Sequence, residues 1–594
     1  MKTSTNFARV AVTAGLTAVM TLGNVVAPAA MALADTGSTV TFTDVDYAAS
    51  TTYKGIQIFK AKVATTGGTQ TVSNIEWAND DAKKAVLDAI KTKDASFVGE
   101  NAQDAADWLN VNAGGFPGTG AMVASNDVLS MIAANLKASN LWSTTTKGNA
   151  SLSGLEAGYW LFLTDTAGTP GGTSTDTFTS PVYVALDGVS ATTVTPKKGV
   201  PTVEKKVLDD AEAAVVDPKT SDKWNDVADS QIGQEINYRL TGTIASNYAT
   251  FDTYAYKFTD VLSGGLDYVE GSVKVYALND GAYEEINSKN YTVTSPDARN
   301  NNNTLTVEFK VGDDKKGLKD VAGVDANSKI VVFYKAKLNG NAVIGNADGN
   351  KGGNPNTVKL EYSNNPYAEG TGETIENTVA DFAFKLNLNK VDQGTERGLA
   401  GAVFTIQSDD ANTEGQYVAS KADAAKDIVA GQLVAVADAN NLPEYVKFTS
   451  GSDGKIAVSG LDAGSYKVTE VQTPDKSKYT KANPFTFTIK PKYDDKAMKV
   501  TGLTASVSEA DKGRTDIAFG TLDGTVGDHE LTGKDGTGTN AATGEVTINV
   551  GNAKSVDLPI TGLNGVTLTW VAGGAVLVIG VAHLIRGRRE ESEE

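Results

Sequence analysis

Short stretches of alternating apolar and polar residues recur along most of this 594-residue chain, separated by turns rich in Gly and Asn. Alternation with a period of two is typical of β-strands that bury one face. Clear examples are Leu305–Phe309, Ile330–Tyr334 and Val358–Tyr362. A chain of this length exceeds the size of a single hydrophobic core. The pattern therefore predicts a mainly-β protein built from tandem β-sandwich domains of the immunoglobulin-like type.

The composition argues against several classes of function. The chain has no Cys and only two His, His529 and His583, so it has no disulfide or thiolate metal site, and a His-based triad is not expected. The net charge of −19 disfavours nucleic acid as a partner. We find no nucleophile–His pair, metal cluster or phosphate-binding loop in the sequence. We therefore expect no enzyme activity, no cofactor and no bound metal.

The first 34 residues have the features of a signal peptide. Lys2 and Arg9 form a basic start, an apolar stretch runs from Val10 to Val26, and Ala32-Leu33-Ala34 has the small-x-small pattern of a cleavage site. We predict that residues 1–34 direct export and are then removed. An exported chain without disulfides needs another means of withstanding stress, and covalent bonds of a different kind could supply it.

The segment 558–594 has three parts in a fixed order. Leu558-Pro559-Ile560-Thr561-Gly562 comes first, an apolar run over 566–585 is long enough to span a bilayer, and Arg586-Gly587-Arg588-Arg589 follows. This order resembles the cell-wall sorting signal of Gram-positive sortase substrates. The resemblance implies that the membrane holds the precursor only transiently. A sortase would then cut after Thr561 and join its carbonyl to an amine of another subunit or of peptidoglycan.

Three domains are predicted between these ends. Residues 35–196 combine strand patterns with helical patterns near 80–112 and 127–136, so the first domain should be β with helical insertions. A Pro- and Gly-containing hinge over Thr195–Pro201 marks the next boundary. Strand patterns then dominate 197–380 and 381–557, which we predict to be the middle and C-terminal domains.

The C-terminal domain resembles the collagen-adhesin B-type repeats of Gram-positive pilins. Lys390-Val391-Asp392 is similar to their first strand, and Gly464–Pro474 resembles the glutamate-containing segment called the E-box. In that family a Lys on the first strand forms an isopeptide bond with an Asn on the last, and the E-box Glu catalyses it. Carried over by position, the resemblance implies a bond between Lys390 and Asn552, assisted by Glu470.

The chemistry of such a bond sets physical requirements. A Lys amine is protonated in water, and burial lowers its pKa and yields the neutral nucleophile. A buried carboxylic acid can hydrogen-bond the Asn amide and move protons. Packing of the domain supplies proximity, which is worth several orders of magnitude in rate. Ammonia leaves and the bond forms once, so the reaction is maturation and not turnover.

The middle domain resembles the related A-type module of shaft pilins. The matching stretches are Pro201–Val207, Tyr256–Asp260 and Leu360–Pro366. The resemblance implies a bond between Lys205 and Asn364, assisted by Asp260. Alternation supports the choice, because Lys205 shares a strand face with Val203 and Val207, and Asn364 shares one with Leu360 and Tyr362. Their sequence neighbours Lys206 and Asn365 remain alternatives.

The hinge carries a further candidate. Val194-Thr195-Pro196-Lys197 partly resembles the pilin motif of shaft pilins, with Thr195 in place of the usual Tyr. The resemblance implies that Lys197 is the amine that resolves the sortase thioester of the next subunit, with Lys198 as the alternative. Thr561 of one chain would then be joined to Lys197 of another. An open head-to-tail contact of this kind propagates into a fibre.

Taken together, these motifs identify the chain as similar to the major, or shaft, pilins of sortase-assembled fimbriae of the SpaA and FimA type. The resemblance implies a cell-wall or pilus location in a Gram-positive bacterium. The implied partners are a sortase, further copies of the chain, accessory pilins, peptidoglycan and a host-surface receptor. The alternative interpretation is a monomeric, wall-anchored adhesin that binds a host protein or glycan and has no use for Lys197.

Overall fold

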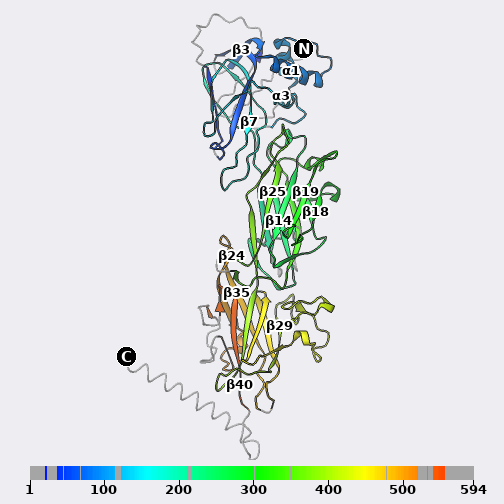
Figure 1. Cartoon of the computed structure of the whole chain (residues 1–594), viewed down its shortest axis with the longest axis vertical. Helices are drawn as coiled ribbons and strands as arrows, with labels where there is room; N and C mark the ends of the chain where they lie inside the picture. Colours follow the sequence, from blue (N-terminus) through cyan, green and yellow to red (C-terminus); the bar gives the residue numbers. More distant parts are fainter. Residues whose placement is uncertain are drawn as a thin grey trace, which may run out of the picture.

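Three β-rich bodies follow one another along the long axis of the computed structural model (Figure 1). The structure describes residues 21–22, 37–44, 46–66, 69–113, 122–209, 217–299, 301–347, 351–476, 478–519, 531–532 and 539–554. Strands make up most of the regular structure, so the mainly-β prediction is confirmed. The rest of the predicted signal peptide, the motif Leu558–Gly562 and the predicted span 566–585 lie outside the described residues. Within the described ranges, no helix has the length and hydropathy needed to cross a membrane.

The first body combines two sheets with three helices. One sheet has the strand order β1-β4-β3-β7-β8, with β5 beside β3, and the other has the order β6-β2-β9. The bounds are β1 (Thr21–Leu22), β2 (Ser38–Phe42), β3 (Thr52–Thr66), β4 (Thr69–Trp77), α1 (Asp80–Lys93), α2 (Ala102–Asn112), α3 (Val128–Leu136), β5 (Ser143–Thr144), β6 (Ser151–Leu155), β7 (Gly158–Thr166), β8 (Val182–Leu186) and β9 (Ala191–Val194).

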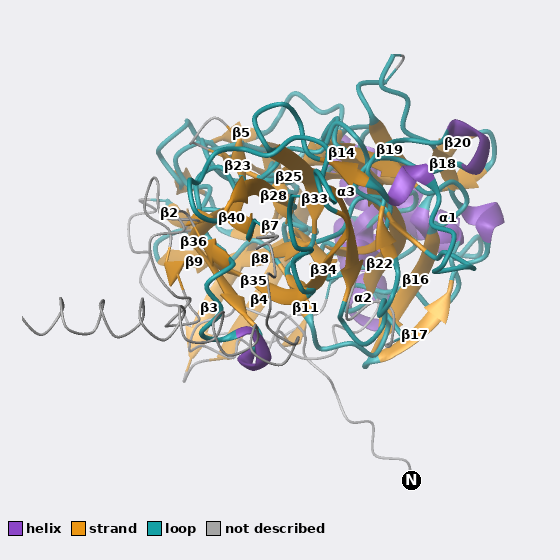
Figure 2. Cartoon of the chain, turned by 90° about the horizontal axis from the view of Figure 1, so that it is seen from below, coloured by secondary structure: helices purple, strands orange, loops and turns teal. Residues whose placement is uncertain are grey.

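The helices of the first body start where the sequence offers N-cap residues. The side chains of Asn79, Asn101 and Asp127 each accept a hydrogen bond from a backbone N–H in the first turn of α1, α2 and α3. Apolar side chains such as Val86 and Ile132 then pack into one core with the sheet. Figure 2 shows these helices gathered on one side of the strands. The predicted helical insertions are therefore present.

The second body is a sandwich of two sheets. Their orders are β11-β10-β13-β22-β16-β17, with β15 beside β22, and β12-β27-β25-β14-β19-β18, with β26 beside β25. The bounds are β10 (Val203–Leu208), β11 (Trp224–Asn225), β12 (Val227–Asp229), β13 (Glu235–Thr243), η1 (Tyr248–Thr250), β14 (Tyr256–Leu262), β15 (Leu266–Tyr268), β16 (Lys274–Asn279), β17 (Ala282–Glu285), η2 (Ser288–Asn290), β18 (Thr292–Thr294), β19 (Thr304–Phe309), β20 (Val311–Gly312), β21 (Lys315–Lys316), η3 (Leu318–Asp320), β22 (Lys329–Leu338), β23 (Asn346–Ala347), β24 (Lys351–Gly352), β25 (Asn354–Ser363), β26 (Thr371–Glu373) and β27 (Asn377–Phe382).

The third body is also a sandwich. Its sheets have the orders β33-β28-β40-β37, with β39 beside β40, and β31-β30-β29-β34-β35-β36-β38, with β32 beside β29. The bounds are β28 (Phe384–Asp392), β29 (Val403–Ser408), β30 (Tyr417–Val418), η4 (Ala424–Lys426), β31 (Leu433–Val434), η5 (Glu444–Val446), β32 (Phe448–Thr449), β33 (Lys455–Leu461), β34 (Gly464–Gln472), β35 (Phe485–Asp494), β36 (Lys499–Val507), η6 (Glu509–Asp511), β37 (Ile517–Phe519), β38 (Leu531–Thr532), β39 (Thr539–Asn540) and β40 (Glu545–Asn552).

The segment between β7 and β8 connects the first body to the second. The Phe178 backbone N–H donates to the Asn364 carbonyl at 2.8 Å, and the Asn247 side chain donates to the Phe178 carbonyl at 2.8 Å. The Thr175 N–H also donates to the Glu373 carbonyl at 2.8 Å. These bonds join the segment 167–181 to the end of the second body where β25 finishes.

The second and third bodies meet through β12 and the turn after it. The Asp229 carboxylate accepts from the Tyr493 hydroxyl at 2.5 Å and from the Ala463 N–H at 3.0 Å. The Ile232 N–H donates to the Gly460 carbonyl at 3.0 Å. Gly460 has a φ of 84°, and a Cβ there would meet Ile232 at 2.2 Å, so this contact requires glycine. Specific polar contacts therefore fix the junction.

Candidate functional site

Strand β10 carries a lysine into the interior of the second body. Lys205 is fully buried on the same face as the core residue Val207, as alternation along a strand requires. Lys206 points the other way, remains partly exposed, and forms an ion pair with Asp226 at 2.7 Å. The sequence left Lys205 and Lys206 as alternatives for the bond-forming lysine, and the structure places Lys205 in the core.

The Lys205 amine reaches across the sandwich to the opposite sheet. Its Nζ donates to the two carboxylate oxygens of Asp260, on β14, at 2.7 Å and 2.5 Å. It also donates to the hydroxyl of Tyr334, on β22, at 2.9 Å. The rings of Tyr238 and Tyr334 flank the amine, each with its centroid 5.1 Å from Nζ. The predicted pair of Lys205 and Asp260 is thus in direct contact.

Burial shifts the protonation of both groups toward their neutral forms. It lowers the pKa of the Lys205 amine to about 8, although the Asp260 carboxylate opposes this shift. It also raises the pKa of the Asp260 carboxyl, with Lys205 as the main opposing influence. A neutral amine next to a protonated carboxylic acid is the combination that amide formation needs.

An asparagine that the sequence comparison overlooked completes this site. Asn356, on β25, is fully buried, and its Nδ2 donates to the Tyr334 hydroxyl at 2.6 Å. The Lys205 amine and the Asn356 amide therefore both donate to the same Tyr334 hydroxyl. Within the described part of the chain, the Asn356 Oδ1 is buried without a hydrogen-bond partner. We refer to Lys205, Asp260, Tyr334 and Asn356 as the middle site.

The structure corrects the expected pairing of Lys205 with Asn364. Asp260 lies opposite Val358 in the β14–β25 ladder, and Asn364 is six positions further along, which corresponds to about 20 Å of extended chain. The Asn364 side chain instead donates to the Asp176 carbonyl of the first body at 3.2 Å. Asn364 is therefore a residue of the junction between bodies, and the alternative Asn365 lies beyond it.

A second buried lysine lies where the first and last strands of the third body pair. Strands β28 and β40 are parallel, with Lys390 opposite Val550 and Asp392 opposite Asn552. Lys390 and Asn552 are therefore diagonal neighbours on one face, within reach of a long side chain. Both are buried, and the Lys390 Nζ donates to the Val550 carbonyl at 2.8 Å.

Glu470 on β34 faces this pair from the opposite sheet. Its Oε1 accepts from the Asn552 Nδ2 at 3.0 Å, and its Oε2 accepts from the Ala482 N–H at 2.7 Å. Burial lowers the pKa of Lys390 to about 8, while the charge of Glu470 opposes the shift. The structure thus brings together all three residues predicted here, and we call Lys390, Glu470 and Asn552 the C-terminal site.

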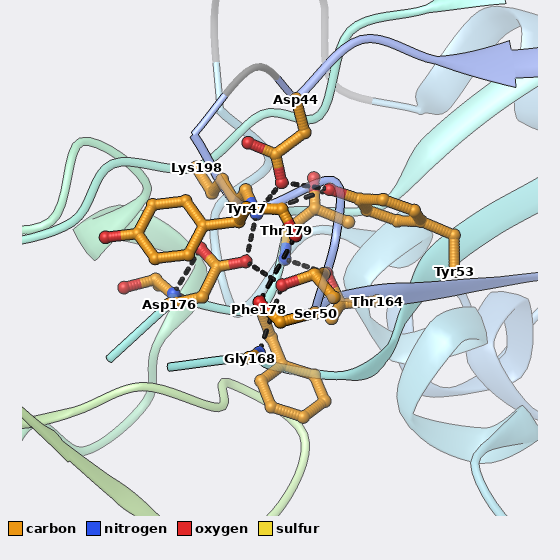
Figure 3. Close-up of polar contacts among 12 residues, drawn as sticks. Asp44, Tyr47, Ser50, Tyr53, Thr164, Gly168, Asp176, Phe178, Thr179 and Lys198 are labelled. Atoms are coloured by element: carbon orange, nitrogen blue, oxygen red, sulfur yellow. Dashed lines mark hydrogen bonds and ion pairs between the residues drawn. The ribbon is translucent and has the colours of Figure 1, made fainter. Parts of the chain in front are cut away.

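The linker lysines differ in their surroundings. The Lys197 backbone is held by a bond from its N–H to the Thr179 hydroxyl at 2.7 Å, and burial lowers the pKa of its partly buried side chain. Lys198 points into the first body, where it pairs with Asp44 at 2.6 Å and with Asp176 (Figure 3). Thr561, the predicted partner of the linker lysine, lies outside the described residues.

The two residues that sequence reasoning missed left different signals. Asn356 continues the inward-facing series of Val358, Leu360 and Tyr362, so alternation makes it a candidate for the buried face. The comparison of motifs instead selected the Asn just beyond the strand. Tyr334 lies in the middle of β22, at the end of the apolar run Ile330–Tyr334, and gives no signal of a polar role. As to metals, no group of three or more His, Asp or Glu in the described ranges could hold an ion.

Comparisons with known proteins bear on the third body and on the general architecture. Residues 384–503 match the protein-family model described as SpaA, prealbumin-like fold domain. No curated protein matches the chain in sequence.

Solved structures similar to the chain include Gram-positive pilins. The T6 backbone pilin of serotype M6 Streptococcus pyogenes is 14% identical, with 88% of this chain and 99% of that chain covered and a TM-score of 0.46. The full-length major pilin SpaD from Corynebacterium diphtheriae is 15% identical, with 88% and 98% covered and a TM-score of 0.42. Values this low support no inference about function. The family match is confined to the third body: over residues 384–503 the chain has a prealbumin-like domain of the SpaA family.

Proposed function

We propose that this chain is the structural shaft subunit of a covalently polymerised cell-surface pilus. The observation that carries the proposal is the occurrence of two buried lysine sites, one in each of two successive β-sandwiches. Each site combines a buried amine, a buried carboxyl group and a buried Asn amide. Such a set serves amide formation within the protein, because an external substrate cannot reach the buried reacting groups.

The bond of the middle site would join the two sheets of the second body through β10 and β25, and the bond of the C-terminal site would join the adjacent strands β28 and β40 of one sheet. In the middle site Lys205 attacks the Asn356 side-chain carbonyl, Asp260 moves the protons, and ammonia leaves. In the C-terminal site Lys390 attacks Asn552 with Glu470 in the same role. The reaction runs once per chain. Since the chain has no Cys, these amides take the part that disulfides have in other exported proteins.

Polymerisation would use the linker. Lys197 lies at the junction of the first two bodies, and its lowered pKa favours the neutral amine that a sortase thioester requires. The sorting motif Leu558–Gly562 supplies Thr561 as the acyl donor. Repetition of this step joins the subunits head to tail, and the last transfer goes to peptidoglycan. The resulting fibre presents the chain at the cell surface and supports adhesion.

Boiled envelope extracts test this function. Cells that produce the chain with a matching sortase should yield a ladder of SDS-resistant species recognised by an antibody against the chain. Covalent subunit linkage predicts such a ladder, because boiling in SDS separates all non-covalent assemblies. If the extracts release only single chains, the monomeric wall-anchored adhesin is the better description.

Replacing Glu470 with Gln should slow the formation of the Lys390–Asn552 bond by about 100-fold or more, since the amide side chain cannot move protons. Peptide mapping of the denatured full chain should then find Lys390 in a linear peptide. The matched control is Glu545→Gln on β40, which removes the charge that pairs with Lys385 at the surface. A Lys390–Asn552 bond formed at the wild-type rate in Glu470→Gln would rule out the role of Glu470.

A further inference from the structure

The first body has a buried lysine of its own, which the proposed function does not use. Lys198 follows β9 in the linker, and its side chain is only 7% exposed. Its Nζ donates to Asp44 Oδ2 at 2.6 Å and to Asp176 Oδ2 (Figure 3). The rings of Tyr47 and Tyr53 flank the amine, with centroids 5.3 Å and 5.6 Å from Nζ.

This arrangement repeats the chemistry of the middle site. In both places two tyrosine rings enclose a buried lysine amine, and a buried carboxylate accepts its hydrogen bonds. The difference is the electrophile, since Lys198 contacts a second carboxyl group, whereas the middle site has the Asn356 amide on the far side of the Tyr334 hydroxyl. An amine can attack the carbonyl carbon of a carboxylic acid as it attacks that of a side-chain amide. The leaving group is then water in place of ammonia.

The surroundings assign different roles to the two carboxyl groups. Asp176 has no exposed surface, and burial raises the pKa of its carboxyl, which is opposed mainly by Lys198. Its Oδ2 accepts from the Thr51 hydroxyl at 2.6 Å, and its Oδ1 accepts from the Thr177 N–H at 2.8 Å. Asp44 accepts from the Tyr53 hydroxyl at 2.5 Å and from the Lys198 amine at 2.6 Å, so its carboxyl group is in place to exchange protons with the attacking nitrogen.

We propose that Lys198 and Asp176 form an intramolecular amide bond, with Asp44 as the base. Asp44 takes a proton from the attacking nitrogen and passes it to the departing oxygen. The Nζ–Cγ bond forms and one Cγ–O bond of Asp176 breaks. Of the three protons on the Lys198 ammonium, one stays on the amide nitrogen and two leave with the oxygen as water. No oxidant or external reactant is required.

The bond would fix the linker to the junction between the first two bodies. Asp176 belongs to the segment 167–181, and its backbone carbonyl accepts from the side chain of Asn364 in the second body. An amide from Lys198 to Asp176 closes a loop of roughly 20 residues and so restricts the unfolded chain, as a disulfide across the same loop would. It also consumes the Lys198 amine, which leaves Lys197 for polymerisation.

Peptide mapping of the denatured, full-length wild-type chain tests the proposal without any substitution. We expect a peptide around Lys198 joined to one around Asp176, lighter by one water. The bonds at Lys205 and Lys390 lose ammonia instead, so the same digest reports the three bonds separately. A linear peptide with a free Lys198 amine, or a bond from Lys198 to Asp44, would overturn the assignment even if the other two bonds are present.

Two variants sharpen the test. Lys198→Arg keeps the positive charge next to the two carboxylates and should abolish this bond alone. Asp176→Asn converts the acceptor into an amide, so the bond should form with loss of ammonia instead of water. An unchanged water loss in Asp176→Asn would contradict Asp176 as the acceptor. Intact bonds at Lys205 and Lys390 in the same samples verify that the second and third bodies of the variants have folded.

Discussion

Replacing Asn356 with alanine is expected to leave the second body without its internal amide bond and to lower its melting temperature by about 10–20 °C. The bond closes a loop of roughly 150 residues, and the chain-entropy scale for cross-links gives about 5 kcal/mol for a loop of this size. A domain of 150–250 residues loses about 2–4 °C for each kcal/mol. Calorimetry resolves this transition, and peptide mapping should find Lys205 in a linear peptide.

The matched control for this variant is Asn364→Ala. Both residues lie on or next to β25, but only Asn356 contacts the Tyr334 hydroxyl that also binds Lys205. Asn364→Ala should keep the cross-link and lose only one bond to the Asp176 carbonyl. If instead Asn364→Ala abolishes the link and Asn356→Ala retains it, the geometric assignment is wrong and the motif-based one is right.

Replacing Lys197 with alanine should remove every band above the single chain that arises from self-polymerisation. The substitution takes away the amine that resolves the sortase thioester of the next subunit, while Thr561 remains available for transfer to the wall. Lys197 lies in the linker outside both cross-linking sites, so the internal amides should form as before. Immunoblots of boiled envelope extracts measure the ladder, and peptide mapping verifies the internal bonds.

Lys198→Arg is the matched control, since it changes the neighbouring residue and keeps its charge. Its ladder should equal that of the wild type, because Lys198 is held by Asp44 and Asp176 inside the first body. A ladder that persists in Lys197→Ala and disappears in Lys198→Arg would exchange the roles of the two lysines.

Much of the architecture could be predicted from the sequence because it depends on local patterns. Alternation along the strands identified the β-sandwich character, and the helical periodicity of 80–112 and 127–136 identified the insertions in the first body. The C-terminal site could also be predicted, since Lys390 and Asn552 lie near the ends of the first and last strands and Glu470 lies in a recognisable segment. Here the motif fixes the positions along the chain.

The middle site could be predicted only in part because it depends on register between strands. Alternation gave the correct face for Lys205, yet Asn356, on β25, and Asn364, just beyond its end, have the same parity. Only the pairing of Asp260 with Val358 shows which of them is near the amine. The Lys198 cluster could not be predicted from the sequence, because Lys198 and Asp44 are 154 positions apart in the chain.

The most direct measurement is peptide mapping of the mature wild-type protein after denaturation. Acylation of buried lysines within the β-sandwiches predicts two cross-linked peptide pairs, Lys205 with Asn356 and Lys390 with Asn552, each lighter by one ammonia. Recovery of both lysines from the folded protein in linear peptides with free amines would contradict it.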